Sequence, residues 1–292
     1  MRITNNMISQ NLLRNLETSQ EKIQQLQDQV SSGQKINKPS DDPIGISNVM
    51  RLNNSISSVA QYSSSAGAAL DTMNATDSTL GDITSMLQSV KDLAVQGADG
   101  TQTADDRTTI AAQVDQLAAQ LKISANTQIG SKYIFSGTAT DTETIAADGT
   151  FQGNNQDVNL TMGNNVSIPI SVNGQTLFGD STTGVFATLN NLSTALKAND
   201  TTAIEATLND LDTNINNVIN QRAELGGSVN RVTALQSQLD STTANLKQSL
   251  SDVQSSDIAQ TYTDFTAQQT TYKAALSVGS QILQLSLVDY MK

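Results

Sequence analysis

The sequence predicts a mainly α-helical protein with a small β insert: an elongated antiparallel helical bundle or coiled-coil rod, with paired terminal helices and an outer β domain. Apolar residues recur at three-four spacing along both ends of the chain and along two long inner segments, which is the period of an amphipathic helix. The middle is rich in Gly, Asn and Thr and alternates between apolar and polar residues, as strands do. All three prolines lie outside the expected helix interiors, as long straight helices require.

Composition limits what the chain can do. With 292 residues, 3% aromatic residues and no tryptophan, thin helical bundles are favoured over a thick globular core. The chain has no cysteine and no histidine, which removes disulfides, thiolate and imidazole metal ligands and the commonest general base. Any enzyme of this composition would have to work with carboxylates, Lys, Tyr or hydroxyl groups alone. We expect no catalytic residue, no cofactor, no metal site and no enzymatic activity.

Charge and hydropathy disfavour further classes. The net charge is −12 and there is no basic stripe, so nucleic-acid binding through counterion release is disfavoured. No stretch approaches the roughly 18 apolar residues of a membrane span. Residues 1–16 lack a continuous apolar core and a small-residue cleavage site, so we expect no cleaved secretory signal peptide.

The first helix is expected over 4–32, with Gly33 ending it. A connector follows, in which Asp42 is the expected N-cap of the next helix and Pro43 its first residue, because the missing N–H of proline is not needed there. Asp41 beside Asp42 suggests acid–base or metal chemistry as an alternative. Capping and a favourable interaction with the helix dipole already account for the pair.

Two long helices of matching length are expected near 43–97 and 202–255, each about 80 Å at ~1.5 Å per residue. Their equal length suggests that they lie antiparallel. A shorter third helix should lie alongside them, with Thr103 as its N-cap and Asp106 as the partner in a capping-box-like pair.

The second long helix is expected to open with Thr202 as N-cap and Glu205 as its capping-box partner. A short helix around 185–196 precedes it. The Gly226-Gly227 pair should cost about 2 kcal/mol against alanine in a helix. Because the apolar register continues through the pair, we expect close helix packing there rather than a break.

Residues 132–181 are expected to form a small β domain that leans on the helices. Alternating apolar residues predict strands over 158–162 and 166–172. The dipeptides Asp148-Gly149 and Asn173-Gly174 are hairpin signals. The acidic residues of this segment, expected on a solvated outer face, are Asp141, Glu143, Asp148 and Asp157.

These elements divide the chain into five segments, and the first and last helices should meet at one end of the rod. The expected boundaries are 1–42 for the N-terminal tail helix and its connector, 43–131 for the first part of the rod, 132–181 for the β domain, 182–255 for the second part of the rod, and 256–292 for the C-terminal tail helix.

Several segments of the chain resemble those of one known family. They are LETSQEKIQQLQDQVSSGQKINKPSDDP (16–43), LQSVKDLAVQG (87–97), NQRAELGGSVNRV (220–232) and SLVDYMK (286–292). In this order along nearly the whole chain, they are similar to the flagellin family. The resemblance implies a structural subunit of the bacterial flagellum that self-assembles through coiled-coil terminal helices. It also implies export to the cell exterior through the flagellar type III apparatus without signal cleavage.

Within the family, KINKPSDDP (35–43) followed by KYIFSGTATDT (132–142) and a single small β domain resembles the members that join hook to filament rather than flagellin proper. This implies a ring of identical copies between a hook-side junction protein and flagellin. It also implies a type III export chaperone that binds near the C-terminal helix, with neither nucleic acid nor membrane as a partner.

Two sets of residues carry the implied function. The assembly interface should be formed by the apolar seams of the two tails: Ile3, Met7, Leu12, Leu16, Ile23, Leu26 and Val30 in the first, and Ile258, Tyr262, Phe265, Tyr272, Leu276, Leu283, Leu287 and Tyr290 in the second. The spoke loop between tails and rod corresponds to Asn37, Lys38, Pro39, Ser40, Asp41, Asp42 and Pro43.

Three alternatives stay open at this point. The nearest is flagellin itself, the repeating subunit of the filament. An exported enzyme acting on glycans would need two carboxylates of the β domain close together in a concave site. A coiled-coil adhesin would use the β domain as its binding surface and would not need the tails.

Overall fold

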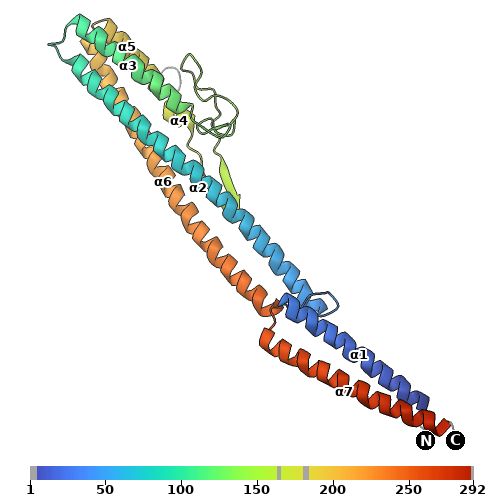
Figure 1. Cartoon of the computed structure of the whole chain (residues 1–292). Helices are drawn as coiled ribbons and strands as arrows, with labels where there is room; N and C mark the ends of the chain where they lie inside the picture. The colour runs from blue at the N-terminus through green and yellow to red at the C-terminus, as the bar shows by residue number, and fades with distance from the viewer. Residues whose placement is uncertain (1–4, 163–165, 180–183, 291–292) are drawn as a thin grey trace. The chain divides into compact units, whose positions relative to one another are not determined.

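The computed structural model describes residues 5–162, 166–179 and 184–290, and these are mainly α-helical, as predicted (Figure 1). Side chains are described from Met7 to Ser280, apart from residues 8, 162–166 and 180–183. The helices are α1 (Asn5–Ser32), α2 (Pro43–Ala98), α3 (Ala104–Ala125), α4 (Gly174–Phe178), α5 (Val185–Lys197), α6 (Thr201–Gln254) and α7 (Ile258–Tyr290). The strands are β1 (Gln128–Ile129), β2 (Lys132–Tyr133), β3 (Asn159–Met162) and β4 (Val166–Pro169).

These elements form two units. The terminal unit comprises Met1–Val59 and Ser241–Lys292, and the central unit comprises Ala60–Asp240. The long helices α2 and α6 contribute residues to both units. Within each unit, helices from distant parts of the sequence lie against one another.

Local sequence signals set the start of α2 and of α3. The carboxylate of Asp42 accepts hydrogen bonds from the backbone N–H groups of Ile44 (3.1 Å) and Gly45 (2.9 Å), so Asp42 caps α2 as predicted. Thr103 and Asp106 form the predicted capping box at the start of α3, each side chain accepting from the backbone N–H of the other.

The helix α6 is capped by Asp200 rather than by Thr202. The Asp200 carboxylate accepts a hydrogen bond from the backbone N–H of Ala203 (3.1 Å), and α6 begins at the residue after Asp200. Asn199 adopts a left-handed φ of 58°, which ends the preceding turn and leaves Asp200 as the first residue able to cap. The predicted capping box of Thr202 and Glu205 is therefore wrong, because both lie inside the helix.

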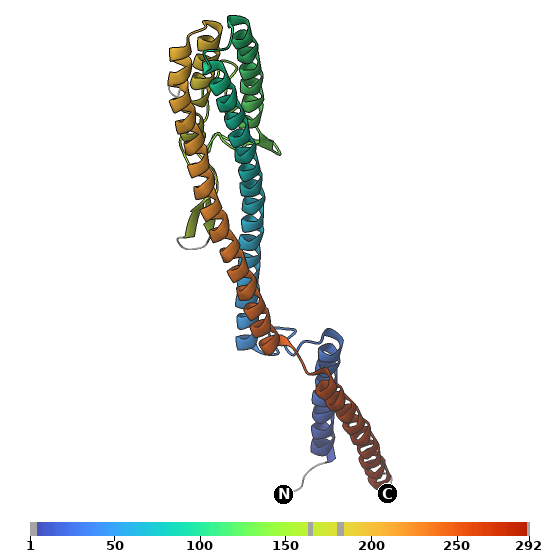
Figure 2. The same ribbon diagram turned by 90° about the vertical axis from the view of Figure 1, so that its left-hand side faces the viewer.

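In the central unit, α2 and α6 run antiparallel, as predicted. Ion pairs join Lys91 of α2 to Asp212 of α6 (2.5 Å) and Asp77 of α2 to Arg222 of α6 (2.6 Å). The higher-numbered residue of α2 therefore pairs with the lower-numbered residue of α6, which means that the two helices run in opposite directions. Figures 1 and 2 both show the two helices side by side in this unit.

The core of the central unit lies between α2, α3, α5 and α6. A Cβ atom on Gly97 would meet Leu196 of α5 and Ile110 of α3, so the end of α2 lies in close contact with both helices. The third helix therefore lies alongside α2, as predicted. Buried apolar residues follow helical spacing on each element: Leu80, Ile83, Leu87 and Val90 on α2, Val114 and Leu121 on α3, Leu189 and Leu192 on α5, and Leu211 and Val218 on α6.

The helix α6 continues through Gly226 and Gly227 without a break, as predicted. The expected close packing at this pair is wrong, because a Cβ atom on either glycine would meet no described atom within 4 Å. Both glycines therefore weaken the helix relative to alanine without improving a contact in the described part of the chain.

The middle segment contains two small antiparallel sheets. In one, Gln128 pairs with Tyr133, and in the other, Leu160 pairs with Ile168. The second sheet confirms the two predicted strands over shorter ranges, β3 and β4. The Asp148-Gly149 turn is also confirmed: Gly149 has a φ of 86°, and an isolated bridge joins Ile145 to Phe151 on either side of the turn.

The second predicted hairpin turn is wrong. Asn173 instead caps α4, its side chain accepting a hydrogen bond from the backbone N–H of Gln175 (2.9 Å). Gly174 is buried, and a Cβ atom there would overlap the backbone carbonyl of Phe135, so glycine is needed for a close approach rather than for a turn. The rings of Phe135 and Phe178 meet edge to face, with 5.6 Å between centroids, and form the core beneath α4.

In the terminal unit, α1 and α7 lie side by side and antiparallel (Figure 1). The Gln268 side chain donates a hydrogen bond to the Ser19 hydroxyl (3.0 Å), and a Cβ atom on Gly279 would lie 2.6 Å from Leu12. Gly33, with a φ of 69°, ends α1 as predicted. The expected pairing of the first and last helices is therefore confirmed.

Candidate functional site

The predicted seam of the first tail faces α7. Leu26 is buried, and Leu12, Leu16, Ile23 and Val30 are half-buried. Successive members of this set are three, four or seven residues apart, and each of these spacings returns a side chain to nearly the same face of an α-helix. All five therefore lie within a narrow stripe of α1. The structure therefore brings these predicted residues together on one helix face.

The predicted seam of the second tail is divided. Phe265 and Tyr272 are half-buried and belong to the face of α7 that also carries buried Thr261 and Gly279. Gln268 lies on the same face and contacts α1, so this face is the one covered by the partner helix. Two of the five predicted positions of this seam with described side chains are thus partly covered within the chain.

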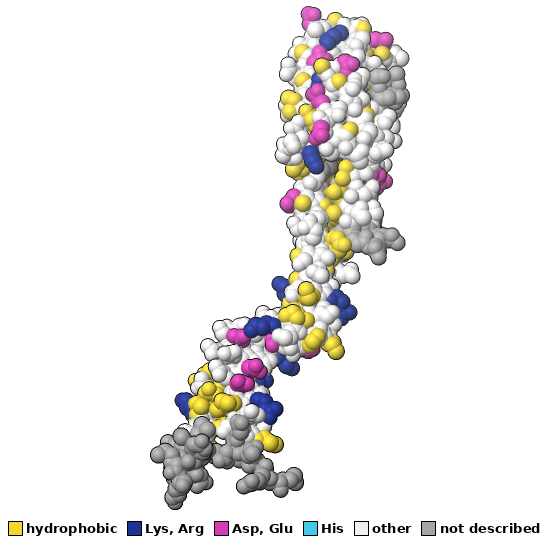
Figure 3. All heavy atoms as spheres, turned by 90° about the vertical axis from the view of Figure 1, so that its right-hand side faces the viewer, with side chains coloured by type: hydrophobic (Ala, Val, Ile, Leu, Met, Phe, Trp, Pro, Cys, Tyr) yellow, Lys and Arg dark blue, Asp and Glu magenta, His cyan; other side chains and the backbone are white. Residues whose placement is uncertain are grey.

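The other described positions of this seam stay exposed. Ile258, Tyr262 and Leu276 are 56%, 57% and 45% exposed. Ile258 and Leu276 lie about five helical turns apart and therefore on one side of α7, next to the covered face. The apolar stripe of α7 is wider than the surface that α1 can cover. In Figure 3, hydrophobic side chains gather on the surface of this helix pair.

On the opposite side, the helix pair is polar. A groove of about 700 Å³ between α1 and α7 is lined by Lys22 and Gln29 of α1 and by Gln260, Asp264 and Gln268 of α7. A neighbouring groove of about 600 Å³ shares Lys22 and Gln268 with it. The helix pair therefore has one apolar side and one side of amides and mixed charges.

Some predicted interface residues lie elsewhere or outside the described structure. Met7 is 54% exposed, and its position on α1 is turned well away from the seam of Leu12 and Leu26. Leu13, which sequence reasoning missed, is 58% exposed; its only signal is its place directly after Leu12. Ile3 lies outside the described residues, and the side chains of Leu283, Leu287 and Tyr290 on α7 are not described.

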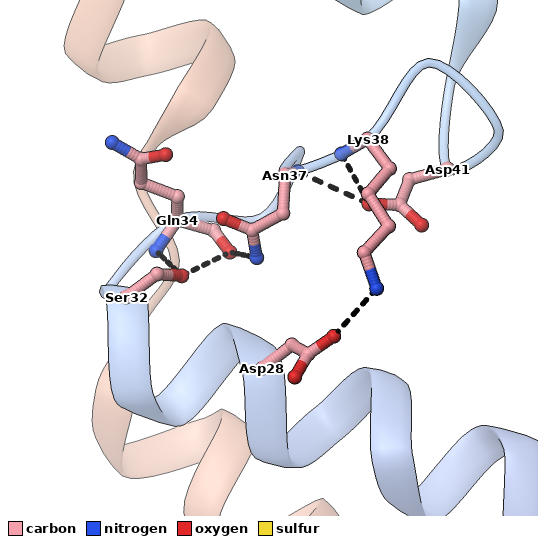
Figure 4. A network of polar contacts seen from close by, with 6 residues as sticks. All are labelled: Asp28, Ser32, Gln34, Asn37, Lys38 and Asp41. Carbon is pink, nitrogen blue, oxygen red and sulfur yellow. Dashed lines mark hydrogen bonds and ion pairs between the residues drawn. The ribbon is translucent and has the colours of Figure 1, made fainter.

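The predicted spoke loop is an ordered turn (Figure 4). The Asp41 carboxylate accepts hydrogen bonds from the backbone N–H groups of Asn37 (3.0 Å) and Lys38 (2.9 Å), and the backbone N–H of Asp41 donates to the Lys38 carbonyl (3.0 Å). Asp41 therefore holds the turn. Pro39 and Ser40 form its exposed tip.

One ion pair joins this turn to α1. The ammonium group of Lys38 lies 2.9 Å from the carboxylate of Asp28 (Figure 4). Its hydrogen bond to Asp28, together with the negative charge of that group, raises the pKa of Lys38 above its ordinary value. Both side chains are at least half exposed, so the pair mainly orients the turn.

The backbone of the connector also pairs with the link between α6 and α7. The N–H of Lys35 donates to the carbonyl of Gln254 (2.6 Å), and the N–H of Ser256 donates to the carbonyl of Gly33 (3.0 Å). The Gln254 side chain donates to that of Gln34 (2.9 Å). The two chain segments that enter and leave the helix pair are thus joined to each other.

Two of the acidic residues of the middle segment, Asp148 and Glu143, have local structural partners. Asp148 accepts from the hydroxyl and backbone N–H of Thr150, which lowers the pKa of its carboxyl group. Glu143 accepts from the Asn126 side chain (2.9 Å). Among the residues with described positions, no three His, Cys, Asp or Glu side chains are placed to hold a metal ion. Over the same residues, no helix is long and apolar enough to span a membrane.

Comparisons with known proteins place this architecture in a family. Residues 3–140 match the bacterial flagellin N-terminal helical region, and residues 208–291 match the bacterial flagellin C-terminal helical region. Together these matches cover both terminal helices, the connector, all of α2 and α3 and most of α6.

Curated relatives match over the full length. The chain is 27% identical over 317 residues to flagellar hook-associated protein 3 of Escherichia coli, covering 100% of both chains. It is 26% identical to a flagellin of Listeria innocua, covering 97% of this chain and 96% of the relative. A solved structure of a putative flagellar hook-associated protein from Vibrio parahaemolyticus shares the fold, with a TM-score of 0.69, 23% identity and coverage of 74% of this chain and 100% of its own. The chain belongs to the flagellin family.

Proposed function

We propose that this chain is the structural subunit that joins the hook to the filament of a bacterial flagellum and that it works by self-assembly, without catalysis. The observation that carries the proposal is the exposed apolar side of the α1–α7 pair, formed by Ile258, Tyr262 and Leu276. Such a surface on a terminal helix pair suits packing against other subunits. The full-length match to hook-associated protein 3 of Escherichia coli supports the junction role.

Assembly would be driven by covering this surface. Full burial of a side chain such as Leu or Ile stabilises by about 1.5–3 kcal/mol. A monomer leaves these side chains in water, whereas neighbouring copies in a ring would cover them. Part of the gain is offset by the entropy lost when helices become ordered. Addition would therefore be favourable where tails of neighbouring subunits already provide a matching surface.

The parts of the chain would have separate roles. Residues 1–42 and 256–292 would form the inner assembly domain, 43–131 and 182–255 the rod, and 132–181 the outer β domain. The start of α2 at Pro43 and the end of α6 at Gln254 support the inner boundaries, because the connector and the α6–α7 link that adjoin them pair with each other.

The proposed partners follow from the junction role. Copies of the chain would form a ring between a hook-side junction protein and flagellin. Before assembly, a type III export chaperone would cover the C-terminal helix, whose exposed apolar side needs protection from aggregation. The protein would act outside the cell and reach that location without a cleaved signal peptide.

Deleting the gene from the bacterium that encodes this chain tests the function. The deletion strain should secrete flagellin monomers, and restoring the gene should restore filaments. A Tyr262→Gln, Leu276→Gln variant should be secreted but should not restore filaments. Both residues are exposed, so monomer stability should change by no more than about 0.5 kcal/mol.

Ile123→Gln is the matched control, because Ile123 is 66% exposed on α3 in the central unit. It should restore filaments as the wild type does. Filament formation by the Tyr262→Gln, Leu276→Gln variant would show that the exposed side of α7 is not an assembly surface. Normal filaments in the deletion strain would contradict the junction role itself.

Flagellin is the second candidate, because the Listeria innocua flagellin matches almost as closely as the hook-associated protein. Addition of purified protein to isolated hooks separates the two. A junction protein should add a short layer of fixed length, whereas a flagellin should continue into filaments that lengthen with protein concentration.

A further inference from the structure

The connector contains one aliphatic side chain, that of Ile36, and it is buried. Its exposed fraction is 4%, although the neighbours Lys35 and Lys38 are exposed. A short polar connector that served only as a tether would leave such a side chain in water. The burial of Ile36 therefore means that the connector packs against the rest of the terminal unit.

The contact of Ile36 is with the first turn of α2. A Cβ atom on Gly45 would overlap the Cδ1 atom of Ile36 and a carboxylate oxygen of Asp42. Glycine at position 45 is thus what allows the connector to approach the helix backbone. Because glycine is unfavourable inside a helix, its presence at this position is accounted for by the close approach.

This contact is one of three attachments. The Lys38–Asp28 ion pair and the hydrogen bond from the Gln29 side chain to the Lys35 carbonyl (2.9 Å) attach the connector to α1. The backbone pairing between residues 33–35 and 254–256 attaches it to the α6–α7 link. The contact between Ile36 and Gly45 attaches it to α2 at a buried position.

We propose that Ile36 and Gly45 are positioning residues for assembly. Their contact holds the connector against the first turn of α2 within the terminal unit, which limits the conformations of the connector before the α1–α7 pair meets neighbouring subunits. Assembly then loses less conformational entropy than it would with a flexible connector, which is the advantage of preorganisation. The consequence for assembly rests on the proposed junction function, whereas the order of the connector can be measured in the purified monomer.

Trypsin cleavage between Lys35 and Ile36 reports on this contact. Cleavage requires the connector to leave α2, and Lys38 does not compete because Pro39 follows it. Gly45→Ala should raise the rate of cleavage after Lys35 at least about tenfold, since the added methyl group displaces Ile36. Mass spectrometry of the fragments identifies the bond that is cut.

Gly67→Ala is the matched control. Gly67 lies on the same helix, and a Cβ atom there would meet no described atom within 4 Å. This variant should be cleaved after Lys35 at the wild-type rate. Circular dichroism of both variants should show wild-type helix content, which separates a local change from unfolding.

A second substitution tests the role of Ile36 itself. Ile36→Val removes the Cδ1 atom that the Gly45→Ala methyl group would overlap. The double variant should therefore recover most of the protection at Lys35, even though the contact with Asp42 remains crowded. If Gly45→Ala acted only by disrupting the Asp42 cap, the addition of Ile36→Val would not restore protection at Lys35.

The assembly consequence is measured in the deletion strain. Gly45→Ala should reduce filament number at least about fivefold while the variant is still secreted, and adding Ile36→Val should restore part of that loss. Wild-type trypsin resistance of Gly45→Ala, or no recovery in the double variant, would overturn the positioning role. Failure of the wild-type gene to restore filaments would instead refute the proposed function and leave the trypsin result standing.

Discussion

Arg222 of α6 donates hydrogen bonds from Nε and Nη2 to the two carboxylate oxygens of Asp77 on α2, at 2.6 and 3.0 Å. Two of the three nitrogens of the planar guanidinium group are used, which fixes the direction of the pair as well as its distance. The guanidinium group also covers Gly81, at 3.6 Å from where a Cβ atom would lie. The pair therefore sets the register of two antiparallel helices at one level of the central unit.

Asp77→Asn should lower the free energy of unfolding at pH 7 by about 0.5–1 kcal/mol, since both side chains are about 40% exposed and the pair is partly screened. The hydrogen bond from Arg222 lowers the pKa of Asp77 below its ordinary 3.8. A carboxyl group with a lowered pKa in the folded state stabilises at higher pH and loses that effect as pH falls through the lowered pKa.

Urea unfolding at pH 7 and near pH 2.5 checks this prediction. The wild type should be more stable than Asp77→Asn at pH 7, and the difference should shrink in acid. Asp82→Asn, an exposed carboxyl group on the same helix, is the control and should change stability little. An equal difference between wild type and Asp77→Asn at both pH values would contradict the role of the ionised pair.

Arg107→Met should destabilise the central unit by about 3 kcal/mol. Arg107 is buried and donates hydrogen bonds to the carbonyls of Gly97 (2.8 Å), Asp99 (2.8 Å) and Gln102 (3.0 Å), and to the side chain of Asn199 (2.5 Å). Methionine fills similar volume but leaves these acceptors without their donor.

The measurement is the urea midpoint, followed by circular dichroism. Arg51→Met is the control, because Arg51 is exposed on α2 and its guanidinium group reaches the side chain of Asn48 within the same helix. A loss below about 0.5 kcal/mol for Arg107→Met would show that the loop carbonyls find other partners in the variant.

Gly226→Ala and Gly227→Ala should each stabilise the protein by about 0.5–1 kcal/mol, because α6 is continuous there and an added methyl group meets no described atom. Gly97→Ala should have the opposite sign and cost about 1–3 kcal/mol, since its methyl group would overlap Leu196. Thermal unfolding of the three variants provides the comparison. Destabilisation by Gly226→Ala would contradict this prediction, because it would mean that the added methyl group meets another molecule or a part of the chain that the structure does not describe.

Limited proteolysis should cut the purified monomer first in its terminal helices. Lys22 and Lys273 lie on a two-helix layer with exposed apolar residues, whereas the central unit has a core shared by four long or medium helices. Trypsin should therefore leave a fragment that contains α2 to α6. Assembly should protect Lys22 and Lys273, and equal protection in monomer and assembly would argue against tails that gain order from their neighbours.

Local signals made much of the secondary structure predictable. Gly33 ends α1, Asp42 caps α2, and Thr103 with Asp106 opens α3, because each feature depends on hydrogen bonds within four residues of itself. The prediction failed at Thr202, again because of a local feature. Asn199 adopts a left-handed conformation, and Asp200, the next residue, caps α6 in place of Thr202.

Features that depend on distant segments were predicted less well. Asn173-Gly174 has the composition of a hairpin turn, but Gly174 is placed against the backbone of Phe135, far away in the sequence, and opens a helix. Gly226-Gly227 suggested close packing, and no described atom lies near. A glycine in the sequence shows only that the residue has no Cβ atom. It does not show whether another segment of the chain lies where that atom would be.

The sequence by itself determined the long helices, several of their ends and the apolar stripes of the two tails, because helical phase and capping are local properties. Tertiary structure alone decided which part of each stripe is covered. It left Tyr272 half-buried on the face of α7 that α1 covers, left Tyr262 in water, and buried Ile36 against Gly45. The physical reason is that burial depends on the width and position of a partner surface, and for α7 that surface lies more than two hundred residues away in the chain.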